Sequence, residues 1–156
     1  MDRQKFYSKK ISKTATIVLK DNIENVFPLF GAFEERKWAS GWNPKLIYPN
    51  HEIIEEGTTF KTSENNSEEK EFLWIVIKFE PDNYLLQYLV TTMNRYWTIT
   101  IKCIPLSKDE TSCDITYKYI GLNEKGNEIN KESLQKIFKN NLKDWEEEIN
   151  YYLKNK

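Results

Sequence analysis

The C-terminal stretch Asn130–Leu153 constrains the fold most, because its apolar residues recur at steps of three and four. Those residues are Leu134, Ile137, Phe138, Leu142, Trp145, Ile149, Tyr152 and Leu153. The spacing predicts one continuous amphipathic helix, which at about 1.5 Å per residue spans roughly 35 Å, the width of a small domain. A helix of this length is stabilised mainly by what its apolar face covers. The rest of the chain should therefore form a surface that packs against it, since no second long heptad segment is present to build a coiled coil.

Length and charge narrow the class of protein. The 156 residues are enough for one domain with a sizeable core. A net charge of −1 gives no overall field that would attract nucleic acid, so we expect no nucleic-acid partner. No window of about eighteen apolar residues predicts a membrane span, and the basic N-terminus lacks the apolar run of a secretory signal. We expect a cytoplasmic protein with a flexible arm at residues 1–12 and a single domain at residues 13–156.

Four segments in the second half of the chain alternate between apolar and polar residues. They are residues 71–80, 84–92, 95–104 and 112–122. The residues expected on the inner face are Leu73, Ile75, Ile77 and Phe79 in the first segment and Leu86, Tyr88 and Val90 in the second. In the third they are Trp97, Ile99, Ile101 and Cys103, and in the fourth Cys113, Ile115, Tyr117 and Tyr119. Such alternation predicts antiparallel strands with one covered and one solvated face. Further strands are expected at residues 14–20, 43–49 and 58–62. Together with the long helix, they predict a two-layer α+β fold.

Two short helices are expected after the first strand. Asp21 is the candidate N-cap of a helix over residues 22–30, which Pro28 should kink because proline lacks a backbone donor. A second short helix is expected over residues 32–39. The segment Ser63–Lys70 is low in apolar residues and is predicted to be a mobile loop.

The run VFPLFGAFEERKWASGWNPKLIYP, Val26–Pro49, resembles the opening of START-like (SRPBCC) proteins of the polyketide-cyclase/dehydrase type. These proteins share the helix-grip fold of the major pollen allergen, and this chain supplies each of its parts in order over about residues 13–153. The resemblance implies an antiparallel sheet wrapped around a long C-terminal helix, with two short helices after the first strand and a cavity between the layers. It says little about function, because the superfamily includes carriers, cyclases, chaperone activators and allergens.

Aromatic residues make up 14% of the chain, and several share the predicted inner face. Buried tyrosine hydroxyls need hydrogen-bond partners, which a cavity that holds water or ligand supplies. We predict a ligand-binding site formed by Trp38, Tyr88, Trp97, Tyr117, Tyr119, Leu134 and Phe138. Glu35 and Arg36 are candidate polar residues at the cavity mouth, with a solvated charged face as the alternative. Trp74 alternates with the predicted inward residues of its strand and so falls on the polar face. It is interpreted as an exposed contact residue.

The sequence offers few groups for metal or cofactor chemistry. His51 is the sole histidine and falls in a predicted turn, so neither a catalytic triad nor a His-based metal site is expected. No Gly-rich phosphate loop is present, and we predict no cofactor. Cys103 and Cys113 share the inner face on either side of one turn and should be cross-strand neighbours. Buried free thiols are the expectation, and a regulatory disulfide is the alternative.

The leading functional hypothesis is the binding of a small hydrophobic or aromatic molecule, lipid or polyketide-like, between the sheet and the C-terminal helix. One alternative is a cyclase or dehydratase, which would have to work with Tyr, Glu and Arg side chains. The other is a co-chaperone-like interaction protein that binds a protein partner through the exposed face with Trp74 and Tyr96.

Overall fold

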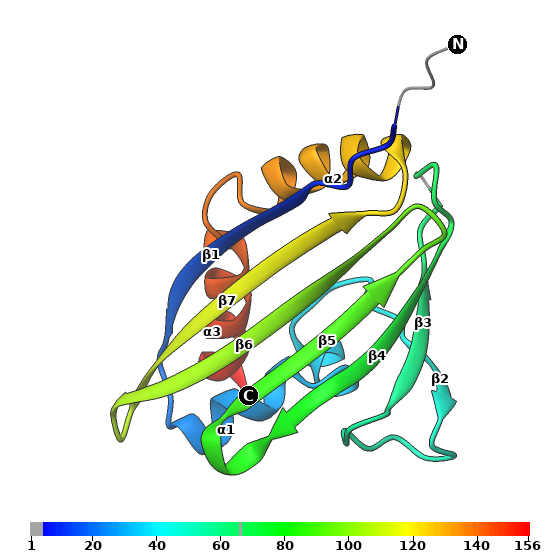
Figure 1. Cartoon of the computed structure of the whole chain (residues 1–156). Helices are drawn as coiled ribbons and strands as arrows, with labels where there is room; N and C mark the ends of the chain where they lie inside the picture. The colour runs from blue at the N-terminus through cyan, green and yellow to red at the C-terminus, as the bar shows by residue number, and fades with distance from the viewer. Residues whose placement is uncertain (1–4, 66) are drawn as a thin grey trace.

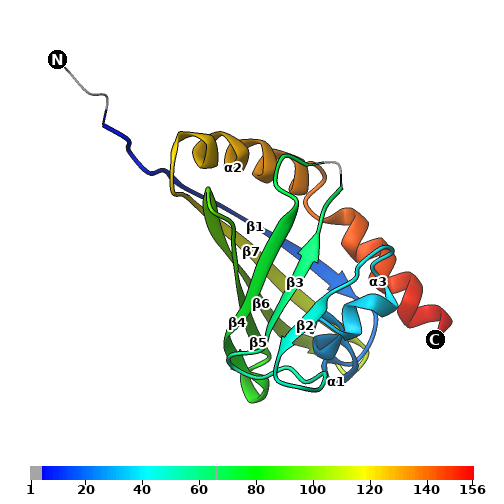
Figure 2. The ribbon, with the colours of Figure 1, turned by 90° about the vertical axis from the view of Figure 1, so that its right-hand side faces the viewer.

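The computed structural model describes residues 5–65 and 67–156. Within them the chain forms one seven-stranded antiparallel sheet with the strand order β1-β7-β6-β5-β4-β3-β2 (Figure 1). The strands are β1 (Lys10–Leu19), β2 (Lys45–Tyr48), β3 (Thr59–Ser63), β4 (Glu71–Glu80), β5 (Leu85–Thr91), β6 (Arg95–Ser107) and β7 (Glu110–Gly121). The helical elements are α1 (Ile23–Val26), η1 (Phe27–Phe30), η2 (Glu34–Lys37), η3 (Pro81–Asn83), α2 (Glu124–Ile137) and α3 (Lys143–Asn155). The strands curve, and α2 and α3 lie across the open side of the sheet (Figure 2). The α+β helix-grip class predicted from the sequence is confirmed.

The inner faces of β5, β6 and β7 are those that the alternation predicts. Their inward residues from Leu86 to Val90, Trp97 to Cys103 and Cys113 to Tyr119 are buried at every second position. The predicted cross-strand neighbours Cys103 and Cys113 face each other directly in the β6–β7 register. This regular pairing makes the central strands a rigid wall for whatever the inner face contacts.

The sequence analysis assigned the wrong residues of the first part of β4 to the inner face. Val76 is buried and Trp74 packs against the core, whereas Leu73 and Ile77 are 37% and 41% exposed. The reason is a register shift between Val76 and Lys78 in the pairing with β5. A β-bulge inserts one extra residue, so that the residues before it and after it follow opposite parities. Phe79, after the bulge, packs against the core as expected.

The C-terminal helical segment is longer than predicted and is broken into α2 and α3. It begins at Glu124, because the side chain of Asn123 caps it by accepting a hydrogen bond from the Gly126 N–H at 2.8 Å. The break falls after Phe138, where Asn141 and Leu142 have φ angles of 54° and 62°. Leu142 is fully buried at this bend. The bend therefore lets two apolar helix faces follow a curved sheet that one straight helix could not cover.

The segments around the first strand also differ in detail from expectation. Strand β1 already begins at Lys10, and the Ser8 hydroxyl donates to the Gly121 carbonyl at 2.6 Å, so part of the expected arm is held on the sheet. Residues 1–4 of that arm lie outside the described residues. Asn22, rather than Asp21, caps α1, and the helix tightens into η1 at Pro28. The second predicted helix is the single turn η2.

Candidate functional site

A cleft of about 900 Å³ opens between the inner face of the sheet and the C-terminal helices. Its walls come from β3, β4, β6 and β7, from the segment that follows η2, and from the facing ends of α2 and α3. The apolar and aromatic residues that line it are Trp42, Phe72, Trp74, Trp97, Ile99, Tyr117, Tyr119, Ile137 and Trp145. Lysines 45, 136 and 139 and the acidic Glu64 and Asp144 are among the polar residues of its lining. The cleft is therefore apolar along the sheet and charged where the loops and helices meet solvent.

Three of the predicted site residues line the cleft, and all three lie on the inner face of β6 and β7. Trp97 and Tyr119 are register partners with ring centroids 5.3 Å apart, and Tyr117 lies 6.0 Å from Tyr119. Phe138 packs edge-on against Tyr117 at 5.6 Å and supports this wall from the helix side. Leu134 packs against the core and is not among the lining residues. Whether these residues contact a ligand stays a prediction.

Trp38 and Tyr88 lie deeper, in the packed core beside the cleft. The indole N–H of Trp38 donates to the Leu29 carbonyl at 2.7 Å, and the Tyr88 hydroxyl donates to the Phe30 carbonyl at 2.8 Å. Both side chains are more than nine-tenths buried. They attach η1 to the sheet and to η2, and neither is among the residues that line the cleft.

Besides Trp145 of α3, two tryptophans that the sequence analysis did not select as site residues lie on the cleft wall. Trp74 stacks on Phe60 with ring centroids 5.4 Å apart, and its indole N–H donates to the Thr62 hydroxyl at 3.0 Å. Trp42 meets Trp74 edge-on at 5.3 Å. The interpretation of Trp74 as an exposed contact residue is wrong, because the bulge in β4 turns it inward. The run Phe72, Trp74, Val76 was the available signal in the sequence.

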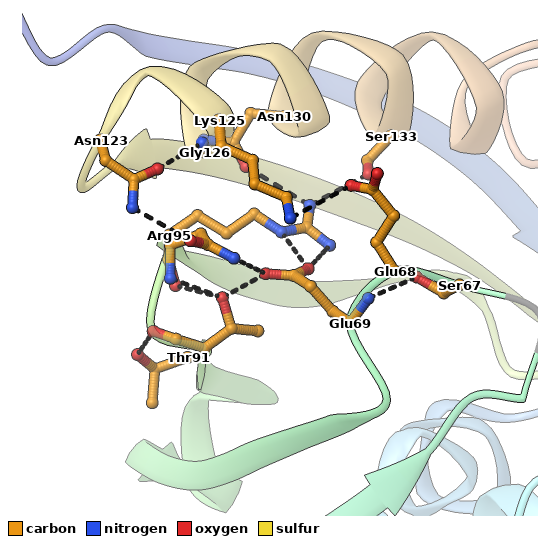
Figure 3. A network of polar contacts seen from close by, with 12 residues as sticks. Ser67, Glu68, Glu69, Thr91, Arg95, Asn123, Lys125, Gly126, Asn130 and Ser133 are labelled. Carbon is orange, nitrogen blue, oxygen red and sulfur yellow. Dashed lines mark hydrogen bonds and ion pairs between the residues drawn. The ribbon is translucent and has the colours of Figure 1, made fainter.

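A buried ion pair lies beside α2, and one of its partners, Arg95, lines the cleft; Figure 3 shows the polar network around it. Arg95 and Glu69 are 5% and 7% exposed, and both Nε and a terminal nitrogen of Arg95 lie 2.8 Å from one Glu69 oxygen. Arg95 also donates to the Ser133 hydroxyl at 3.0 Å, and its guanidinium lies 4.4 Å above the ring of Trp97. The other Glu69 oxygen accepts from the Thr92 hydroxyl. This network joins the β3–β4 loop, the β5–β6 turn and α2.

Sequence reasoning missed this network because Glu69 belongs to the segment predicted as a mobile loop. Its partner Arg95 is 26 residues away, and no local pattern marks a pair at that separation. Buried charges are costly unless they are paired and hydrogen-bonded, so the network holds the loop against the cleft. The only available signal was one arginine at the start of an inward-facing aromatic strand.

The two predicted polar residues of the cavity mouth are neighbours in η2 but have different surroundings. Glu35 keeps some accessible surface, but protein surrounds its carboxyl so closely that burial raises the pKa from 4.5 to about 8. The pKa values of Tyr88 and Tyr117 are raised as well. Burial is the largest cause for both, and the negative charge of Glu35 is a further cause. Glu35 is therefore near these two hydroxyls in the interior. Arg36 is exposed and forms an ion pair with Glu52 at 2.5 Å.

Arg36 and Glu52 border a second, smaller cavity of about 360 Å³. Its apolar lining includes Ile23, Phe27, Phe33, Phe79, Tyr84 and Leu86. Phe60 contacts the walls of both cavities, because its ring centroid lies 6.3 Å from that of Phe33 and 6.1 Å from that of Trp42. Phe60 is fully buried between these rings and is not itself among the lining residues of either cavity.

Neither a candidate metal-binding cluster nor a candidate membrane-spanning helix is found in residues 5–65 and 67–156. No group of three or more His, Cys, Asp or Glu side chains in this part of the chain could hold a metal ion. His51 is exposed and contacts the side chain of Asn50. Over the same residues, no helix combines the length and apolar character that crossing a membrane requires.

Comparison with known proteins gives matches only among solved structures. The sequence matches no protein-family model and none of the curated proteins. Norcoclaurine synthase from Thalictrum flavum is 12% identical, with a TM-score of 0.65 over 94% of this chain and 87% of that chain. A protein of unknown function from Staphylococcus aureus is 8% identical, with a TM-score of 0.67 over 95% and 96% of the two chains. Ara h 8.0201 is 12% identical, with a TM-score of 0.57 over 85% and 94%. These likenesses show the helix-grip fold and thereby confirm, for the fold, the resemblance seen in the sequence.

Proposed function

We propose that this helix-grip protein binds a small hydrophobic or aromatic molecule in the cleft between the sheet and the C-terminal helices. The observation that carries the proposal is the cleft itself, about 900 Å³ in volume with rings of Trp, Tyr and Phe along its sheet side. Ligand pockets of proteins are concave, mostly apolar and roughly 300–1,000 Å³ in volume. A void of this kind that is lined by rings favours apolar ligands over water.

A second candidate function is acid–base catalysis on a molecule held in the same cleft. Glu35 favours it, because a carboxyl whose pKa is about 8 is protonated at neutral pH and can donate a proton. Perturbed pKa values of buried carboxyls are common at catalytic sites. Glu35 is not among the residues that line the cleft, so binding without reaction remains the first proposal. For the third hypothesis, a protein partner, Trp74 no longer contributes. The outer face offers Tyr96, which pairs with Thr91 in the same row of the sheet as the exposed Leu73.

Titration with the fluorescent dye ANS tests the binding proposal. The native protein should enhance the dye's fluorescence, and a small apolar competitor should reverse the effect. Trp97→Ala should weaken dye binding more than it lowers the midpoint of unfolding, since a cavity wall contributes less packing than a core residue. Tyr96→Ala, on the opposite face of β6, is the matched control and should bind the dye as the wild type does. A folded protein that binds no probe would refute the proposal.

A further inference from the structure

The second cavity, of about 360 Å³, shares no lining residue with the cleft. Its lining comes from α1 and η1, from the ends of β4 and β5 with η3, and from the segment before β3. The buried Phe27 lies with its ring parallel to that of Phe79 at 6.2 Å and meets the ring of Tyr84 edge-on at 5.8 Å. Small-molecule sites in proteins are concave, mostly apolar and roughly 300–1,000 Å³ in volume. The second cavity has the size and the apolar walls of such a site.

The charged residues of this lining are mostly acidic. They are Glu24, Glu34, Glu52 and the single cation Arg36. Arg36 forms an ion pair with Glu52, and Glu34 forms one with Lys37, which is outside the lining. Two of the three carboxylates are therefore already matched by a cation, and Arg36 already has an anionic partner.

Glu24 is the third carboxylate, and its partner is a neutral group. It accepts a hydrogen bond from the hydroxyl of Tyr84, and no lysine or arginine in residues 5–65 and 67–156 forms an ion pair with it. This hydrogen bond is the largest cause that raises the pKa of Tyr84, and the charges of Glu24 and Asp82 contribute to the same effect. A cation that enters the cavity would therefore meet an uncompensated negative charge beside Tyr84, and no existing ion pair would have to break.

We propose that the second cavity binds a small apolar amine, whose hydrocarbon body packs against Phe27 and Phe79 and whose ammonium group pairs with Glu24. This site is separate from the cleft and does not depend on the function proposed for it. A neutral molecule with the same body gains the apolar contacts but no ion pair. A carboxylate with the same body is repelled by Glu24 and finds Arg36 already paired.

Three probes with the same hydrocarbon body and different head groups test the inference: cyclohexylmethylamine, cyclohexylmethanol and cyclohexanecarboxylate. Their binding at neutral pH is measured from the shifts of backbone amide signals in two-dimensional NMR spectra. Gly31 lines the second cavity and Gly41 lines the cleft, so these two glycine signals report on the two sites separately. The amine should shift the Gly31 signal and bind about three- to fivefold more tightly than the alcohol, as a partly exposed ion pair predicts. The carboxylate should bind most weakly, and added salt should reduce the preference for the amine.

One variant and a matched control assign the preference to Glu24. Glu24→Gln replaces an exposed side chain and keeps an acceptor for the Tyr84 hydroxyl, and it should bind the amine and the alcohol equally. Glu56→Gln removes the same charge from an exposed residue outside the lining and should keep the preference. Retention of the preference by Glu24→Gln would overturn the inference, as would equal binding of amine and alcohol by the wild type or tightest binding of the carboxylate. An amine that shifts the Gly41 signal but not the Gly31 signal would also overturn it. The ANS test of the cleft is decided independently of these results.

Discussion

Replacing Glu35 by glutamine should make the protein more stable at neutral and alkaline pH. Protein surrounds the carboxyl, and burial raises its pKa from 4.5 to about 8. The folded state therefore binds the Glu35 proton more tightly than the unfolded state does. Its contribution to stability is fully present below about pH 4.5 and is lost as the pH rises through 8. Glutamine has nearly the same shape and no proton to lose.

The size of the effect follows from the two pKa values. Each unit of difference corresponds to about 1.4 kcal/mol. Between pH 5 and pH 8 the wild type should thus lose roughly 3–4 kcal/mol more of its free energy of unfolding than the Glu35→Gln variant loses. This is a large fraction of the 5–15 kcal/mol that stabilises a typical domain. The carboxyls with lowered pKa, Asp21 and Glu146, lose their contributions only at more acidic pH and do not disturb this window.

Urea unfolding followed by tryptophan fluorescence at pH 5, 7 and 8 measures the difference directly. The matched control is Glu34→Gln, one residue away on η2, where the carboxylate is half-exposed and paired with Lys37. That variant should keep the pH dependence of the wild type. If wild type and Glu35→Gln lose stability in parallel over this range, the carboxyl is hydrated and ionised in the folded protein. The argument from its burial would then be refuted, and with it the support for an acid–base role.

Two further predictions concern the buried ion pair and the cysteines. Arg95→Met leaves Glu69 buried without its partner and should cost about 3–5 kcal/mol of stability. Adding Glu69→Gln to this variant should recover part of the loss. A double-mutant cycle that finds no coupling between the two residues would contradict the network. Cys103 and Cys113 are both buried, and their sulfur atoms lie 3.0 Å apart. The hydrogen bond between the two thiols, together with burial, raises the pKa of the Cys113 thiol. Both thiols should therefore react with a maleimide only after unfolding, even without reductant, and rapid labelling of the native protein would show that they are accessible.

The sequence predicts those parts of the fold that depend on a simple period. The inner faces of β5, β6 and β7 follow strict alternation, so Tyr88, Trp97 and Tyr119 were placed correctly on the inside. The alternation of β4 was assigned to the wrong face because both of its faces carry apolar residues. Only the bulge between Val76 and Lys78 distinguishes them, and a bulge is set by pairing with a neighbouring strand.

The rest of the site depends on contacts between distant segments. The spacing of the C-terminal apolar residues continues through Leu142, so the pattern contains no mark of the bend that the curved sheet imposes there. Glycine at position 126 lowers helix propensity and favoured a loop, but a side chain there would meet the Asn94 carbonyl oxygen at 1.8 Å. The pairing of Arg95 with Glu69 is likewise a tertiary property. These features require the positions of strands that no local window contains.

The position of Phe60 has a consequence for the length of the molecules that the interior can hold. Phe60 packs on Trp42 and Trp74, which line the cleft of about 900 Å³, and on Phe33, which lines the cavity of about 360 Å³. If the cleft binds a molecule as proposed, the rings that pack on Phe60 limit how far that molecule can reach toward the second cavity. A smaller residue at this position would remove the ring packed between Trp42 and Phe33 and leave a void on that side of the cleft. The size of the side chain at position 60 would thereby limit the length of a molecule that the interior can hold.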